Sequence, residues 1–521
     1  MRSTIKIVIL LFFICTSMSG ASFPDMEKYM RQHALIWEQL PMQWNEGAFL
    51  GNGLVGMMVY ADSTLNALVF HLGRPDVTDH RKAPYRKTSI GTEEADKMVD
   101  FCRLDVGKML LFPEGKILSG TFYLDIYNAE LTGHLKTDKG DLTFHAYTPQ
   151  PEEVNIVEVS SGVPYRWKGI PGNPCSPRIR VFPHLKEKLK YKDNPAPVVD
   201  QKDKEGSWVQ SLLAGGDYAT YWKEVPGGKS RSVLYVSTAN EVPASSLSLA
   251  KAMKTVEATQ ITGTKLLKQK TRQWWNAYHE RSFLSIPDKK LENFYFIQMY
   301  KLATCSHPDG PAMDVMGTFF KLSPWPSFWW NLNIQLTYMP IGPANRMEQG
   351  KNFQRLMDEV FPSLVRSIEP CKIGDYTWAL QNYYMYLRYA GADWQDIKQQ
   401  VVPKALDAFA VFDKILCYKE NTWHLTHIES PEYEGFQKYN DSNYGLASLS
   451  WLLQTLIACH DRTSSTHPDY ARWKEILTRL VPYPTNENGL MIAANKPLEK
   501  SHRHYSHLLA FYPFRRSEEH T

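Results

Sequence analysis

The 521-residue sequence contains few cysteines and no excess of charge of one sign. Lys and Arg number 59 against 55 Asp and Glu, so the net charge is only +4. No concentrated basic stripe accompanies it, and nucleic acid is not an expected partner. None of the 7 cysteines stands in the paired spacing of a metal-binding motif, so we expect isolated, mostly buried thiols. Apart from Cys15, they are Cys102, Cys175, Cys305, Cys371, Cys417 and Cys459.

Long apolar runs are also missing, except at the N-terminus. Arg2 and Lys6 precede an apolar stretch over residues 7–15, and small residues follow at 19–21. This order is typical of a cleaved export signal, which we place at residues 1–21. The remaining chain has no stretch that is long and uncharged enough to cross a bilayer. We therefore expect a soluble exported protein, located in the periplasm, at the cell surface or outside the cell.

The chain is too long for one hydrophobic core, and its hydrophobic pattern changes near residue 260. Before this point, short alternating runs are separated by Gly, Pro, Asn and Asp, which predicts a β-sandwich domain over residues 22–254. Residues 255–289 follow as a helical linker. From 290 to 521, apolar residues recur at helical spacing and predict an all-α domain. No sequence repeat or low-complexity tract interrupts this division.

Three polar segments interrupt the aromatic, helix-rich second half. They are residues 329–335 (WWNLNIQ), 430–433 (SPEY) and 502–508 (HRHYSHL), which we call the first, second and third islands. Aromatic residues make up 13% of the chain, and aromatic rings stack on sugars as readily as they fill cores. Together the islands are typical of a sugar-cleaving pocket.

The sequence resembles glycoside hydrolase family 95, the inverting α-L-fucosidase family. Residues 44–56 (WNEGAFLGNGLVG) resemble the start of the family's N-terminal β-sandwich. Residues 331–333 resemble its Asn-x-Asn pair, 430–432 its general-acid segment, and 502–508 with 512–513 its histidine block. The order and rough spacing also agree. The resemblance implies a supersandwich, a helical linker and an (α/α)6 toroid.

The chain also departs from the family pattern. Phe328 and Trp329 stand where the family has Tyr-His, and residues 336–339 replace its Met-Asn-Tyr-Trp run. The sugar-contacting surface is therefore altered, and an α-L-galactosyl substrate is an alternative to fucose. The sequence stops at Thr521, where the family continues with more helices and a C-terminal β-domain. We accordingly expect an incomplete toroid with about half of its helices, counted as packed hairpins.

Inverting hydrolysis needs a protonated carboxyl beside the leaving oxygen and a group across the ring that activates water. We predict Glu432 as the acid, because Pro431 stiffens its loop and the nearby Trp423 and Tyr433 favour the protonated carboxyl by desolvation. The alternative for Glu432 is an ordinary solvated loop glutamate.

Asn331 and Asn333 are the predicted water-holding residues. Their amide oxygens can accept hydrogen bonds from water, and the resemblance implies a helper aspartate that falls beyond the histidine block in the family. That aspartate has no assigned position in this sequence. The alternative is that both asparagines merely cap the following helix.

The third island contains three histidines, and imidazole is a common ligand for zinc. Their i, i+2, i+5 spacing does not share one helical face, and no carboxylate or cysteine cluster accompanies them, so we predict no metal and no cofactor. The residues predicted to bind sugar hydroxyls or brace the pocket wall are His502, Arg503, His504 and His507, as the resemblance suggests. Trp329, beside Asn331, is the predicted sugar-stacking residue.

These features predict an exported glycosidase that cleaves terminal α-L-fucosyl or α-L-galactosyl residues from an oligosaccharide or polysaccharide. Two alternatives stay open. One is another (α/α)6 sugar enzyme such as a glycoside phosphorylase, although no convincing phosphate pocket is visible in the sequence. The other is an inactive carbohydrate-binding remnant, because the chain ends early.

Overall fold

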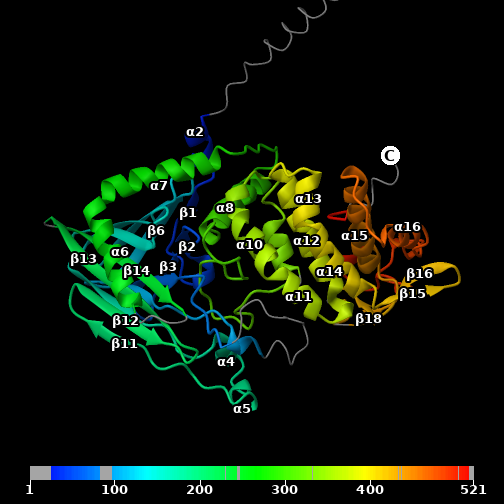
Figure 1. Cartoon of the computed structure of the whole chain (residues 1–521). Helices are drawn as coiled ribbons and strands as arrows, with labels where there is room; N and C mark the ends of the chain where they lie inside the picture. The colour runs from blue at the N-terminus through cyan, green and yellow to red at the C-terminus, as the bar shows by residue number, and fades with distance from the viewer. Residues whose placement is uncertain are drawn as a thin grey trace, which may run out of the picture.

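The computed structural model places a β-rich half beside a helical half (Figure 1). It describes residues 25–81, 97–228, 230–242, 247–330, 332–431, 433–435, 437–502 and 504–514, with backbone only at 97 and 98. The predicted export signal at residues 1–21 lies outside the described residues. The order of the two halves confirms the predicted fold class, a β-sandwich followed by a helical region.

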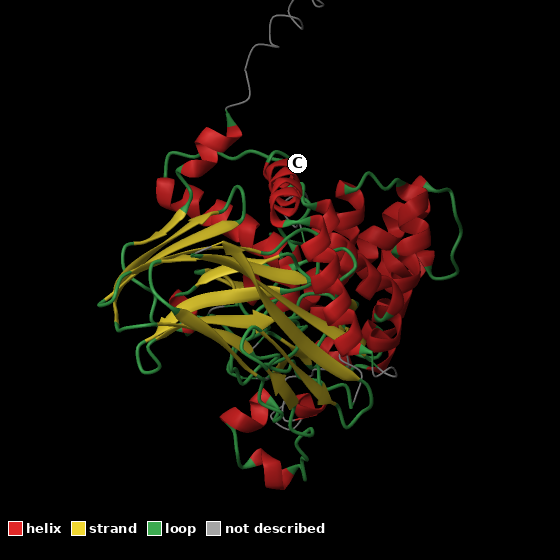
Figure 2. Ribbon diagram, turned by 90° about the vertical axis from the view of Figure 1, so that its left-hand side faces the viewer, coloured by secondary structure: helices red, strands yellow, loops and turns green. Residues whose placement is uncertain are grey.

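Two antiparallel sheets form the N-terminal half (Figure 2). The nine-stranded sheet has the order β1 (Leu35–Trp37), β6 (Ile117–Asp125), β7 (Glu130–Thr137), β8 (Asp141–Tyr147), β9 (Val154–Ser161), β14 (Arg231–Glu241), β13 (Asp217–Gly228), β12 (Glu205–Ser211) and β11 (Val198–Gln201). The five-stranded sheet has the order β10 (Tyr165–Ile170), β5 (Lys108–Pro113), β4 (Ala67–Gly73), β3 (Gly56–Asp62) and β2 (Ala48–Gly51).

Large apolar side chains fill the space between the sheets. Phe70 on β4 packs edge-to-face against Phe144 on β8, with ring centroids 5.4 Å apart, and against Trp167 on β10 at 5.3 Å. All three are buried. On β8 the buried Phe144 alternates with half-buried Thr143 and His145, which turn to the opposite face of the sheet. This alternation is the local pattern that predicts a sandwich strand.

Two linker helices cover part of the outer face of the nine-stranded sheet. These helices are α6 (Ser248–Thr262) and α7 (Thr264–His279), which meet at Gly263 (Figure 1). Val256 of α6 and Leu267 of α7 are buried in one cluster with Tyr147 and Tyr235 of the sheet. The first linker helix begins at Ser248, and its apolar side packs on the sheet.

The helical half contains α8 (Lys289–Cys305), α9 (Asn333–Tyr338), α10 (Lys351–Glu359), α11 (Phe361–Ser367), α12 (Ile373–Tyr389), α13 (Trp394–Gln400), α14 (Val402–Phe412), α15 (Asn443–Arg462) and α16 (Tyr470–Thr478). The described part of this half also contains three two-stranded sheets. Their strands are β15 (Leu416–Lys419) with β16 (Thr422–Leu425), β17 (Ile428–Glu429) with β18 (Lys438–Tyr439), and β19 (Thr485–Asn486) with β20 (Gly489–Leu490). Helix α12 is largely buried and contacts α9, α10, α14 and α15.

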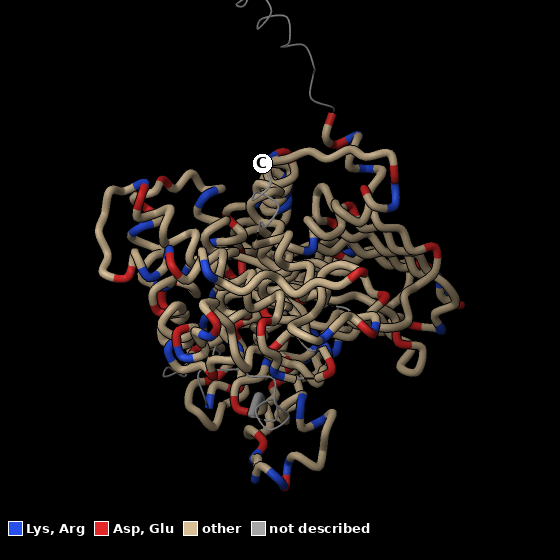
Figure 3. The backbone as a smooth tube through the Cα atoms, turned by 90° about the vertical axis from the view of Figure 1, so that its right-hand side faces the viewer, with Lys and Arg blue, Asp and Glu red and all other residues tan. Residues whose placement is uncertain are grey.

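Short helices lie in the connections of both halves. They are α2 (Met26–Arg31), α4 (Pro177–Val181), α5 (Leu185–Lys188), and the 3-10 turns η1 (Trp44–Glu46), η2 (Lys97–Asp100), η3 (Met347–Gly350), η4 (Pro370–Lys372) and η5 (Ser506–Leu508). Acidic and basic residues intermingle over the side shown in Figure 3. Across the described residues, no helix combines the length and apolar character needed to traverse a bilayer.

The Leu-Gly-Asn-Gly motif at residues 50–53 lies where the sandwich meets the helical half. The Gly53 N–H donates to the carbonyl of Thr304, near the end of α8, at 3.0 Å. The Asn52 amide is buried and donates to the carbonyls of Pro149 and Glu152, both at 2.8 Å. A Cβ on Gly53 would lie 2.3 Å from the carbonyl carbon of Ser306. Glycine at this position therefore permits the close approach of the two halves.

Replacing Gly53 with alanine is expected to destabilise the protein. Gly53 has a φ of +83° and its added Cβ would collide with backbone, whereas Gly263 has a φ of +80° with no atom within 4 Å of an added Cβ. Gly263→Ala is thus a matched control that carries the backbone cost without the collision. We expect Gly53→Ala to lower the free energy of unfolding by about 1–3 kcal/mol more than the control in urea titrations. Equal losses would show that the halves do not meet at this motif.

Candidate active site

The second and third islands contact each other directly, although about seventy residues separate them in the chain. The Ser430 and Ser506 hydroxyls are both buried and lie 2.5 Å apart. The Tyr433 ring packs edge-to-face on the His502 ring at 5.5 Å. The Tyr433 hydroxyl also accepts a hydrogen bond from the Glu499 N–H at 2.9 Å. The loop after β17 and the segment leading to η5 therefore pack against each other.

The first island is attached to α12. Trp330 stacks on Tyr376, with ring centroids 5.2 Å apart and planes 26° apart. The Gln335 side chain on α9 donates to the backbone carbonyl of Asp375 at 2.8 Å, and the Asn382 amide donates to the Gln335 carbonyl at 2.6 Å. These groups are buried, so their hydrogen bonds are costly to break. The start of α9 is therefore positioned by α12.

Segments that flank the other two islands contact the same helix. Gln381 of α12 donates to the carbonyl of Pro513, just beyond the third island, at 3.1 Å. Strand β17, which leads into the second island, contacts both α12 and η4. The Tyr444 hydroxyl on α15 donates to the Asp375 carboxylate at 2.8 Å, and burial raises the pKa of Tyr444 well above its usual value. Helix α12 thus contacts the first island directly and the segments that flank the other two.

Three of the predicted site residues, Asn331, Glu432 and Arg503, lie outside the described residues. Other residues of each island are described. The catalytic and sugar-binding roles of Asn331, Glu432 and Arg503 stay predictions.

Asn333 is the first residue of α9 and is exposed. The residue at the helix N-cap is Leu332, with φ +62° and ψ −50°. A side chain at the N-cap can accept hydrogen bonds from the first N–H groups of a helix. Leu332 occupies this position in α9, so Asn333 is not the capping residue. A non-glycine residue with this backbone costs on the order of 1–3 kcal/mol, so surrounding packing must hold Leu332 in place. Asn333 is left available to a ligand.

Trp329 is 7% exposed and packs against Trp325, with ring centroids 5.1 Å apart. Arg178 of α4 lies over the Trp325 ring at 5.1 Å and donates to the carbonyl of Pro324 at 2.6 Å. The sandwich half therefore contacts the loop that leads to the first island. Sugar stacking by Trp329 stays a prediction, since little of its side chain is open in this structure.

A buried ion pair fixes the same loop. The Arg103 guanidinium donates to the Asp314 carboxylate at 3.1 Å and to the Gly317 carbonyl at 2.6 Å. The Arg103 backbone N–H donates to the Pro326 carbonyl at 2.6 Å. The side chains of Arg103 and Asp314 are 2% and 9% exposed. The sandwich thus clamps the chain on both sides of residue 320, immediately before the first island.

The described histidines of the third island have different surroundings. His504 and His507 are buried, His502 is half-buried, and the His502 and His504 rings lie 5.0 Å apart. Burial, and secondarily the proximity of His502, lowers the pKa of His507. A neutral imidazole both donates and accepts hydrogen bonds, which suits contact with hydroxyl groups. The described part of the chain contains no cluster of three or more His, Cys, Asp or Glu side chains placed to hold a metal ion.

Two carboxyl groups at the site were missed in the sequence analysis. Asp375 joins α12 to α15, and Glu429 ends β17, three residues before Glu432. Burial raises the pKa of Glu429, whose carboxyl lies 3.6 Å from the Cys371 sulfur. Neither residue belongs to a motif, although Glu429 directly precedes the second island. Only the contacts of the folded chain distinguish them.

No protein-family model matches the chain, and no curated protein matches it. Among solved structures, it is similar to a protein from the human microbiome that is named, provisionally, as a kojibiose phosphorylase. The TM-score is 0.58 and the identity 9%, over 90% of this chain and 71% of that chain. A bacterial glucoamylase complexed with acarbose has a TM-score of 0.44 and 9% identity, over 86% of this chain and 69% of that chain.

A family GH92 alpha-mannosidase from Bacteroides thetaiotaomicron has a TM-score of 0.35 and 8% identity, over 83% of this chain and 61% of that chain. The first of these likenesses, at a TM-score of 0.58, shows a shared fold. That fold is an N-terminal β-sandwich followed by a helical region of (α/α)6 type.

Proposed function

We propose that the protein is an exported glycoside hydrolase, divergent from family 95, that removes terminal α-L-fucosyl or α-L-galactosyl residues from glycans with inversion. One observation carries this proposal: the second and third islands contact each other, and α12 contacts the first island and the segments that flank the other two. The second and third islands touch through Ser430 and Ser506, and α12 holds the first island through Asp375 and Asn382.

In the proposed reaction, Glu432 protonates the departing glycosidic oxygen. Asn331 and Asn333 hold the water that attacks the opposite face of the sugar ring, and the bond to the leaving group breaks as the new C–O bond forms. The exposed position of Asn333 at the start of α9 supports this role. Neutral His507 and its neighbours exchange hydrogen bonds with sugar hydroxyls.

A glycoside phosphorylase is the second candidate, because a similarly folded protein carries that name. In a phosphorylase the attacking group is inorganic phosphate, so the product is a sugar phosphate and the reaction stops without phosphate. A hydrolase needs only water. The two functions are therefore distinguished by whether the reaction requires added phosphate.

The test is to incubate the purified chain with fucosylated and α-L-galactosylated oligosaccharides, with and without phosphate, and to follow products by proton NMR. We expect the free β-anomer of the sugar to appear first, at a rate independent of phosphate, because inversion converts an α-linkage into a β-product. A sugar 1-phosphate formed only with phosphate would identify a phosphorylase. If no product forms from any substrate, the result would favour the alternative of a carbohydrate-binding protein without catalytic activity.

A further inference from the structure

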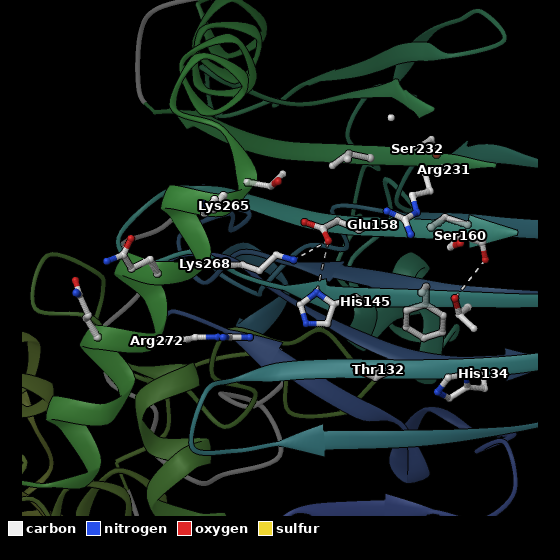
Figure 4. A pocket seen from close by; sticks show the side chains of 18 of the residues that line it. Thr132, His134, His145, Glu158, Ser160, Arg231, Ser232, Lys265, Lys268 and Arg272 are labelled. Atoms are coloured by element: carbon white, nitrogen blue, oxygen red, sulfur yellow. Dashed lines mark hydrogen bonds and ion pairs between the residues drawn. The ribbon is translucent and has the colours of Figure 1, made fainter. Parts of the chain in front are cut away.

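A polar trough lies on the outer face of the nine-stranded sheet, beside α7 (Figure 4). Its volume is about 1110 Å³, and strands β7, β8, β9 and β14 form its floor. Pockets for drug-sized ligands have volumes of roughly 300–1000 Å³, so the volume of this trough is sufficient for several sugar units. None of its lining residues belongs to the three islands.

The strand register explains why the trough is open. One cross-strand row, Tyr147–Ile156–Tyr235, is apolar and lies in the buried cluster under α6 and α7. The row two residues further along runs His145–Glu158–Val233, and the next runs Thr143–Ser160–Arg231. Successive rows on one face are about 7 Å apart. The helices therefore cover the apolar row, and the polar rows beyond it face the trough.

The trough carries an excess of positive charge. Helix α7 has no Asp or Glu in its sequence TKLLKQKTRQWWNAYH, and three of its cations line the trough. Lys268 pairs with Glu158 at 2.7 Å, and Arg272 pairs with Glu130 at 2.5 Å. These two carboxylates are therefore already neutralised.

The third α7 cation, Lys265, lines the trough from the helix, and Arg231 lines it from β14. Both are exposed, and neither makes an ion pair or a side-chain hydrogen bond with any described residue. His134 and Ser160, also exposed, lie on the floor in the same cross-strand row as Arg231. The floor thus offers hydroxyl and imidazole groups together with the Arg231 cation, and α7 offers the Lys265 cation.

We propose that this trough is a second, non-catalytic site that binds an acidic oligosaccharide, one bearing sulfate or uronate groups. Arg231 and Lys265 pair with the anionic groups, because a guanidinium or ammonium group binds sulfate and carboxylate through charge-assisted hydrogen bonds. Floor residues such as Ser160 and His134 contact sugar hydroxyls. The choice of a sugar as ligand rests on the proposed function; the anionic character rests on the charges of the trough alone.

The test is isothermal titration calorimetry on the full chain carrying Glu432→Gln, so that the probe is not consumed. The probes are three oligosaccharides of similar length: one sulfated, one bearing only uronate carboxylates, and one neutral. The trough variant is Arg231→Gln with Lys265→Gln. Lys270→Gln is the matched control, because Lys270 is exposed on the same helix and does not line the trough.

We expect the sulfated probe, the uronate probe, or both to bind, and the neutral probe to bind at least tenfold more weakly. The trough variant should weaken acidic-probe binding about tenfold, because it removes two favourable charge pairs. Lys270→Gln should bind as the parent does. The preferred acidic probe identifies whether sulfate or carboxylate is the recognised group.

Three results would overturn the proposal: no binding of either acidic probe, equal binding by the trough variant, or equal loss in Lys270→Gln. Tighter binding of a single-stranded oligonucleotide of the same charge would also overturn it, in favour of a site for nucleic acid. Hydrolysis is assayed separately, with unsubstituted Glu432. A chain that cleaves glycans but does not bind acidic probes would contradict only the trough proposal, and a chain that binds acidic probes but cleaves no glycan would contradict only the proposed catalytic function.

Discussion

Replacing Glu432 with glutamine is expected to lower kcat for glycan hydrolysis by about 10²–10⁴-fold and to leave KM nearly unchanged. Glutamine keeps the shape of the side chain but has no acidic proton, and general acid catalysis contributes a factor of this size. The loss should depend on the leaving group. A dinitrophenyl glycoside departs without protonation, so the variant should cleave it almost as fast as the parent does.

The matched control is Glu434→Gln, in the same loop. Glu434 forms an exposed ion pair with Lys496 at 3.1 Å and lies two residues from the predicted acid. We expect kcat within about twofold of the parent, because a surface pair contributes little. A large and leaving-group-dependent loss in Glu429→Gln, with little effect of Glu432→Gln, would transfer the acid role to Glu429. That carboxyl is the nearby alternative because burial raises its pKa.

Replacing Arg103 with methionine is expected to lower the free energy of unfolding by about 3 kcal/mol, measured by urea titration. The substitution preserves most of the apolar volume but leaves the Asp314 carboxylate buried without its cation, and removing one partner of a buried pair typically costs this much. The hydrogen bond to the Gly317 carbonyl is lost as well. Because this clamp precedes the first island, kcat should also fall.

A double substitution separates the charge effect from the loss of packing. In Arg103→Met with Asp314→Asn, no uncompensated charge is left, and the asparagine oxygen can still accept the N–H groups of Met316 and Gly317. We expect this variant to be more stable than Arg103→Met alone, since the two positions share one interaction. Additive losses would contradict a buried ion pair.

The exposed pair between Arg31 and Glu27 provides the stability control. These side chains are 66% and 54% exposed, and Arg31→Met should cost less than about 1 kcal/mol. A loss as large as that of Arg103→Met would mean that any arginine-to-methionine change destabilises the protein. The control therefore separates the buried contact from the chemistry of the substitution.

The sequence by itself determined the class and order of the two halves. Alternation with period two, as along Thr143, Phe144 and His145, and helical spacing with period 3.6 are local properties that can be read in a short window. The motif at residues 50–53 lies at the end of β2, within the predicted sandwich. The reason for its glycines, the approach of Gly53 to Ser306, joins residues about 250 positions apart and has no local signal.

Only the tertiary structure decided which distant groups meet. Packing between distant segments brings Ser430 to Ser506 and ties Asp375 to Tyr444, and the Arg103–Asp314 pair crosses from one half to the other. Strand register likewise decided that Thr143, Ser160 and Arg231 stand in one row beside α7. Side-chain pattern along the chain records burial and exposure, whereas these pairings depend on register and packing between segments far apart in sequence.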